Sequence, residues 1–166
     1  MKKLILSIIF IFLLNVCVFA QEGRVNSFKG KFTIGTNTTW IGNTALAVRY
    51  YLTNIVGLEG FFSFRTVSGG YSGRFGNAYA FGVKALRIIK AYKKLNVYVS
   101  PTVGVHSGKD SKQDVTFIGG LGVEWFVLDN LSLSSECGLR LTVGSNFTRF
   151  SSDVDDIPNV SVRLYL

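Results

Sequence analysis

Hydrophobic and polar residues alternate along most of the chain beyond residue 27. In the stretch LSLSSECGLRLTV (residues 131–143), leucine and valine alternate with serine, Glu136 and Arg140. A period of two places successive side chains on opposite faces and predicts a β-strand. The same pattern recurs in eight segments, at residues 28–37, 44–53, 55–66, 77–89, 95–106, 114–127, 131–143 and 159–166. The pattern therefore predicts an all-β protein.

The connections between these segments alternate between short and long. Short turns are expected at residues 53–54, 90–94 and 129–130, and longer polar connections at 38–43, 67–76, 107–113 and 144–158. Most segments have the roughly nine to eleven residues, or slightly more, that a tilted strand needs to cross a bilayer. An even number of strands with short turns at one end and long loops at the other is typical of outer-membrane barrels. We therefore predict an eight-stranded antiparallel up-and-down transmembrane β-barrel, with its turns in the periplasm and its loops outside.

The first twenty residues have the features of a secretory signal peptide. Lys2 and Lys3 precede an unbroken apolar run, and Val18 and Ala20 are small residues at the positions before a cleavage site. We expect cleavage after Ala20, which leaves residues 21–166 as one β-barrel domain. A retained anchor helix is the alternative. Lipoprotein processing at Cys17 is disfavoured because Asn15 and Val16 stand where small residues are expected.

Charge and cysteine content narrow the possible partners. The formal charge of +8 becomes +6 when Lys2 and Lys3 are removed, and Cys137 is then the only cysteine, so no internal disulfide is expected. Positive charge can attract nucleic acid, but an exported chain meets anionic lipid head groups instead. We expect outer-membrane lipids and lipopolysaccharide as partners, and no nucleic acid. No stretch after Ala20 approaches the roughly 18 apolar residues of a spanning helix.

The polar faces of the segments are rich in glycine, alanine and serine. A water-soluble barrel would turn its polar face to solvent, where small side chains have no advantage; a narrow barrel interior requires them. Charged residues on these faces then converge inside: Arg49, Glu59, Arg65, Lys84, Glu124, Glu136, Arg140 and Arg163. Buried charges must be paired, and three acids here face five bases. We interpret this set as a structural charge network, with a narrow pore as the alternative.

Aromatic residues near the segment ends predict interfacial girdles. The aromatic residues expected at the turn end are Tyr50, Tyr51, Phe61, Tyr92, Trp125, Phe126 and Tyr165, and those at the loop end are Trp40, Tyr71, Phe75, Tyr79, Phe147 and Phe150. Aromatic side chains concentrate at both membrane interfaces in transmembrane barrels.

Together, the signal peptide, the eight alternating segments and the interior charges resemble small outer-membrane barrels of the OmpA/OmpX type. The resemblance implies that an interior charged cluster supports the fold, with Glu59, Lys84, Glu124, Glu136 and Arg140 at comparable inward positions. It also implies that the barrel-assembly machinery recognises the last segment, NVSVRLYL, although Leu166 stands where that family usually has phenylalanine. The resemblance further implies an outer-membrane location and loops that can meet an external ligand.

Some eight-stranded outer-membrane barrels are lipid A modifying enzymes, and His106 is the only histidine available for such a site. Strand parity puts His106 inward and Ser107 on the other face, which disfavours a direct catalytic pair. The acidic stretch with Asp153, Asp155 and Asp156 lacks the glycine and terminal glutamate of a calcium loop. We therefore predict no enzymatic activity, no metal and no cofactor, and keep lipid A modification as an alternative function.

Overall fold

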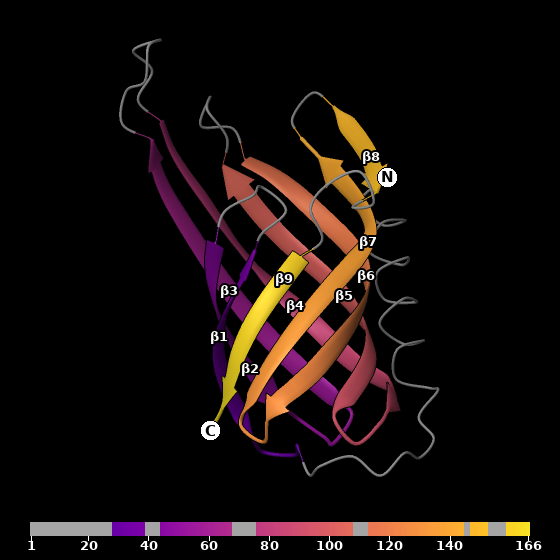
Figure 1. The fold of residues 1–166 in the computed structure, drawn as a ribbon. Coiled ribbons are helices and arrows are strands. Elements are labelled where there is room, and N and C mark those ends of the chain that lie inside the picture. The colour runs from indigo at the N-terminus through magenta and orange to yellow at the C-terminus, as the bar shows by residue number, and fades with distance from the viewer. Residues whose placement is uncertain (1–27, 39–43, 68–75, 108–112, 145–146, 153–158) are drawn as a thin grey trace.

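The computed structural model describes residues 28–38, 44–67, 76–107, 113–144, 147–152 and 159–166, with side chains omitted at 65–67 and 76–78. The alternating segments form one antiparallel sheet that closes on itself (Figure 1). The strands are β1 (Phe32–Thr38), β2 (Thr44–Tyr51), β3 (Val56–Val67), β4 (Gly76–Ala91), β5 (Leu95–Ser107), β6 (Gln113–Leu128), β7 (Leu131–Val143), β8 (Thr148–Ser152) and β9 (Asn159–Tyr165).

Eight of these strands, β1–β7 and β9, make up the barrel wall. Each pairs with its neighbours along the chain, and β9 closes the barrel by pairing with β7 on one side and β1 on the other. In the closing register Gly35 of β1 lies opposite Arg163 of β9, and Ser132 of β7 lies on the other side of Arg163. The predicted eight-stranded antiparallel barrel is confirmed.

The short turns lie together at one end of the barrel, which we call the turn end. Between β2 and β3 the hydroxyl of Thr53 accepts hydrogen bonds from the backbone N–H groups of Ile55 and Val56, at 3.2 and 3.0 Å. Residues 92–94 join β4 to β5, and Asp129–Asn130 joins β6 to β7. These turns agree with the predicted short connections. The C-terminal end of β9 lies at this end of the barrel as well (Figure 1).

The first predicted strand was placed too early, because residues 28–31 form a turn and β1 begins at Phe32. Gly30 has a φ of 80°, a backbone conformation that residues other than glycine rarely adopt. Its N–H donates to the carbonyl of Tyr51 at 2.9 Å. The turn folds the chain back so that Phe28 is buried inside the barrel base.

The predicted final loop, residues 144–158, contains a further strand. β8 pairs with the last part of β7, where Leu139 lies opposite Ser152 and Val143 opposite Thr148. β9 occupies the same edge of β7 lower down, at Leu131–Glu136. The β7–β8 hairpin therefore extends the wall beyond the level where β9 begins (Figure 1).

Apolar side chains cover the outer surface of the wall. Exposed outward residues include Phe32, Ile34, Leu46, Val48, Leu58, Phe62, Phe64, Phe81, Val83, Leu121, Val123, Leu133, Leu139, Val160, Val162 and Leu164. Exposing this apolar surface to water would cost a large free energy, whereas the lipid-facing surfaces of membrane barrels are apolar in the same way. No helix in the described part of the chain is long and apolar enough to span a membrane. The predicted signal peptide, residues 1–20, lies outside the described residues.

Candidate functional site: the barrel interior

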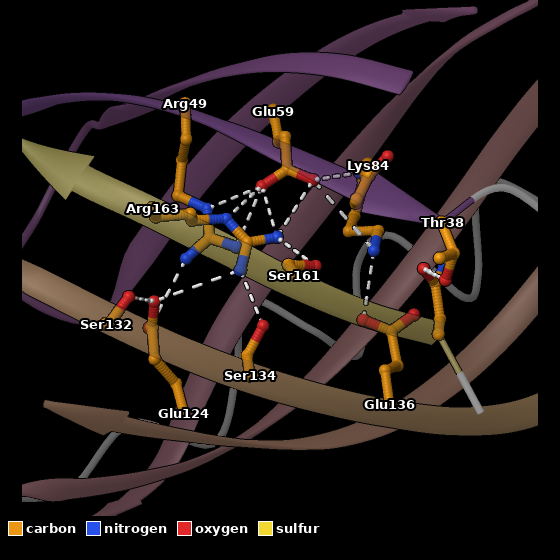
Figure 2. Close-up of polar contacts among 12 residues, drawn as sticks. Thr38, Arg49, Glu59, Lys84, Glu124, Ser132, Ser134, Glu136, Ser161 and Arg163 are labelled. Atoms are coloured by element: carbon orange, nitrogen blue, oxygen red, sulfur yellow. Dashed lines mark hydrogen bonds and ion pairs between the residues drawn. The ribbon is translucent and has the colours of Figure 1, made fainter. Parts of the chain in front are cut away.

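The charged residues inside the barrel centre on Glu59, which is fully buried (Figure 2). Its carboxylate lies 2.8 Å from a guanidinium nitrogen of Arg49 and 3.0 Å from one of Arg163. Asn37 donates a further hydrogen bond to it at 3.1 Å. Charge-assisted hydrogen bonds of this kind offset the cost of burying a carboxylate.

Glu124 forms the second acidic position, across the lumen from Glu59. Its carboxylate lies 3.4 Å from Arg49 and 4.0 Å from Arg163, so both arginines bridge the two acids. The hydroxyl groups of Ser132 and Tyr165 donate to Glu124 at 2.7 and 2.9 Å. The two arginines and two acids link β2, β3, β6 and β9 through the lumen, and Ser132 adds β7.

Lys84 and Glu136 continue the network toward the loop end. The Lys84 ammonium lies 3.0 Å from Glu136 and 4.0 Å from Glu59. Together the connected residues are three acids, Glu59, Glu124 and Glu136, and three bases, Arg49, Lys84 and Arg163. The charges of this six-residue network therefore balance.

Two further bases were predicted to join the interior set. Arg140 is half-buried and lies on the inner face nearer the loop end, opposite Ile118 on β6 and Ser151 on β8. The backbone of Arg65 lies in β3 opposite Ala78, and its side chain lies outside the described residues. Among the described residues, three of the five predicted bases therefore form ion pairs within the six-residue network.

Glycines opposite the bulky interior side chains explain the small-residue composition of the inner face. A side chain at Gly120 would begin 2.5 Å from the Glu136 carboxylate and 2.5 Å from the Ser100 hydroxyl. A side chain at Gly122 would collide with the ring of Tyr98. The lumen is therefore narrow, and its space is divided between large residues and the glycines that face them.

Below the charges, an aromatic cluster fills the turn end of the barrel. The ring of Phe28 stacks on Tyr51 and Phe126 with centroid distances of 5.0 and 5.6 Å, and lies 5.7 Å from the ring of Tyr165. Leu86, Ile88 and Tyr98 complete this buried cluster, which we call the aromatic plug. The plug is joined to the charges above it by the Arg49–Tyr51 hydrogen bond of 2.9 Å.

Four residues predicted for the turn-end girdle are buried instead, and three of them belong to the aromatic plug, which the sequence pattern does not predict: Tyr51, Phe126 and Tyr165 in the plug, and Phe61. Tyr165 was expected at the membrane interface, but it is buried inside the barrel with its hydroxyl on Glu124. Tyr50 and Trp125 are exposed on the outer surface, whereas Trp40 lies outside the described residues. Alternation along the last strand puts Tyr165 on the same face as Arg163, and this pattern indicates its inward position.

His106 lies on the inner face near the loop end. It lies opposite Asp114 on β6, with 3.6 Å between its Nε2 atom and the carboxylate. Ser107, the next residue, occupies the opposite face of β5 and lies across from Tyr79 and Gln113. The geometry places an acid beside the histidine but directs the neighbouring serine away from it.

Within the described ranges, no group of three or more His, Cys, Asp and Glu side chains could hold a metal ion. The acidic residues Asp153, Asp155 and Asp156 lie outside those ranges. Cys137 is a free thiol exposed on the outer, leucine-bearing face of β7.

Comparisons with known proteins agree with this architecture at the level of the fold. No protein-family model matches the chain, and no curated protein matches its sequence. The N-terminal β-barrel domain of Pseudomonas aeruginosa OprF is similar at 12% identity and a TM-score of 0.58, covering 85% of this chain and 100% of that domain. A de novo designed transmembrane β-barrel is similar at 13% identity and a TM-score of 0.51, covering 88% of this chain and 100% of the design.

The attachment invasion locus protein Ail of Yersinia pestis is also similar, at 14% identity and a TM-score of 0.38, covering 82% of this chain and 96% of that protein. At such identities the likeness concerns the fold alone, and we base it on the first two structures. The chain has the fold of the eight-stranded transmembrane β-barrels, and the expected OmpA/OmpX-like architecture is confirmed.

Proposed function

We propose that the protein is an integral outer-membrane barrel with a closed interior, which anchors external loops in a structural or surface-interaction role. The observation that carries the proposal is the contrast between the two faces of the wall. Apolar side chains cover the outside, while the balanced charge network and the aromatic plug occupy the inside. Lipid suits the outer face, and the filled lumen leaves the loops as the part that can meet a partner.

Membrane insertion and topology test this proposal directly. The folded protein should give a β-rich circular dichroism spectrum in detergent and migrate faster on gels before heating than after. Single cysteines introduced at Ser72 and at Thr148, which is exposed at the start of β8, should react with a membrane-impermeant reagent on intact cells in a Cys137→Ser background. Recovery as a water-soluble monomer would contradict the barrel proposal, and labelling only after cell disruption would contradict the proposed loop orientation.

Conductance separates the closed barrel from a narrow pore. The interior ion pairs, such as Arg49 with Glu59 at 2.8 Å, would have to separate before ions could pass, and the plug with Phe28 lies beneath them. We therefore expect no resolvable single-channel current in planar bilayers. A steady current carried by the unmodified protein would favour the pore instead.

The lipid A modifying alternative depends on His106, which faces inward beside Asp114. We expect identical lipid A mass spectra from cells with and without the protein. A new acylation pattern that disappears in the His106→Gln variant would establish the enzyme. The proposed partners during biogenesis and in place are the barrel-assembly machinery and outer-membrane lipids, including lipopolysaccharide.

A further inference from the structure

We propose that the turn end of the barrel binds the head groups of anionic phospholipids in the inner leaflet of its membrane. The inference rests on the proposed function, because that function places the turns at the inner leaflet. Five exposed lysines carry it: Lys29, Lys31, Lys90, Lys93 and Lys94. We call this set the lysine rim.

The lysine rim gives the turn end a strong excess of positive charge. Among the described residues, the exposed acidic side chain at this end is Asp129. Five lysines against one aspartate leave a charge of +4 on these side chains. Anionic head groups are attracted to basic clusters of this kind near a membrane surface.

The backbone holds the lysines in place around the turn between β2 and β3. On one side, the N–H of Lys29 donates to the Asn54 side chain at 3.0 Å. On the other side, the N–H of Ile88, two residues before Lys90, donates to the carbonyl of Ile55 at 2.8 Å. The two lysine groups therefore flank one turn, and the charge is concentrated on one part of the circumference.

The lysine rim also lies at the depth of lipid head groups. Phe32, Tyr50, Tyr92 and Trp125 are exposed on the outer surface near the same end, as interfacial aromatic residues are. The Lys90 ammonium lies 5.5 Å from the centre of the Tyr92 ring, so the positive charge and an interfacial aromatic occupy the same level. Phosphate groups lie beside such aromatic belts, within reach of flexible lysine side chains.

Backbone hydrogen bonds hold the main chain that carries the lysine rim in place without a bound lipid. The carbonyl of Lys94 accepts from Phe126 at 2.8 Å, and that of Lys31 accepts from Tyr51 at 3.1 Å. Both donors belong to the aromatic plug. Head groups can therefore bind without ordering the backbone, which reduces the entropic cost of binding.

Native mass spectrometry of the full mature protein tests the inference. The protein is released from detergent micelles that contain equal amounts of phosphatidylglycerol and phosphatidylcholine, and the retained lipids are counted. Each lysine near an anionic surface favours binding by about fivefold. The K90Q/K93Q/K94Q variant should lose at least that factor in its preference for phosphatidylglycerol, and K29Q/K31Q should show a separate loss.

Two matched variants complete the test. Arg149→Gln removes one exposed positive charge from β8 at the loop end and should leave the preference unchanged. K90R/K93R/K94R keeps the charge and should retain it. Equal retention of the two lipids by the unmodified protein overturns the inference, and so does an unchanged preference in both glutamine variants. Failure to insert into micelles or vesicles would contradict the proposed function instead.

Discussion

Glu59→Gln should be the most damaging single change in the charge network. It removes the carboxylate that lies 2.8 Å from Arg49 and 3.0 Å from Arg163, with the Lys84 ammonium at 4.0 Å. Two acids then face three bases, so one buried positive charge is uncompensated. Removing one partner of a buried ion pair costs about 3–5 kcal/mol. Glu136→Gln leaves the same two acids against three bases, but it breaks a single 3.0 Å pair and Lys84 keeps Glu59 at 4.0 Å, so it should cost less, about 3 kcal/mol.

A double variant separates charge balance from packing. Arg163→Gln alone leaves three acids against two bases, whereas Glu59→Gln with Arg163→Gln leaves two acids and two bases. The double variant should therefore cost less than the sum of the two single variants. Directly contacting residues show coupling of about 0.5–3 kcal/mol, and the 3.0 Å pair makes the upper part of this range the expectation.

The assay is urea-induced unfolding at neutral pH in phospholipid vesicles, followed by tryptophan fluorescence and by the gel shift of unheated samples. Trp125 is exposed on the outer surface, so its emission reports loss of the lipid environment. The reasoning fails if Glu59→Gln unfolds at the same urea concentration as the unmodified protein. It also fails if the single changes at Glu59 and Arg163 add without coupling.

Three further predictions concern the plug, the inner glycines and the C-terminal strand. Phe28→Ala should lower the free energy of unfolding by about 3 kcal/mol in the same urea assay, because a buried aromatic ring leaves a cavity. Gly120→Ala should cost about 1–3 kcal/mol because its methyl group would meet Glu136, whereas Gly60→Ala, which has open space around it, should be within error of the unmodified protein. Leu166→Asp, which puts a charge at the exposed position directly after β9, should lower the fraction assembled in membranes of intact cells; an unchanged fraction would reject recognition through this residue.

The wall of the barrel was predictable because lipid and lumen impose opposite demands on alternate residues. Arg49, Glu59 and Lys84 each lie on the polar face of their strand. The short turn between β2 and β3 limits the register in which Arg49 and Glu59 can pair. In the structure Arg49 lies opposite Glu59, and Glu59 opposite Lys84. Where a strand has one apolar and one polar face, a slip of one residue would reverse both, so the register is strongly specified.

The features that alternation does not predict lie outside the part of the wall that has one lipid-facing and one lumen-facing side. β8 extends above the start of β9, and its sequence TRFSS carries no apolar alternation. Phe28 is placed by the turn at Gly30, not by strand parity. For Tyr165 the alternation indicates the inner face and the position near a strand end indicates the membrane interface; in the structure Tyr165 lies on the inner face. Inward aromatics at the end of a barrel strand can close the lumen, and parity separates them from an interfacial girdle.

Contacts across the lumen cannot be predicted from alternation alone, because they also depend on the register in which β9 pairs with β1. Glu59 and Arg163 are 104 residues apart in sequence, yet they form the centre of the network. In the closed barrel Gly35 lies between Arg163 and Ala47, and a side chain at Gly35 would begin 2.9 Å from the Arg163 Cγ atom. Arg163 therefore passes over Gly35 toward β3. Closure in this register and pairing of the buried charges depend on each other. If β9 were shifted along β1, Arg163 would lie opposite a residue with a side chain instead of opposite Gly35.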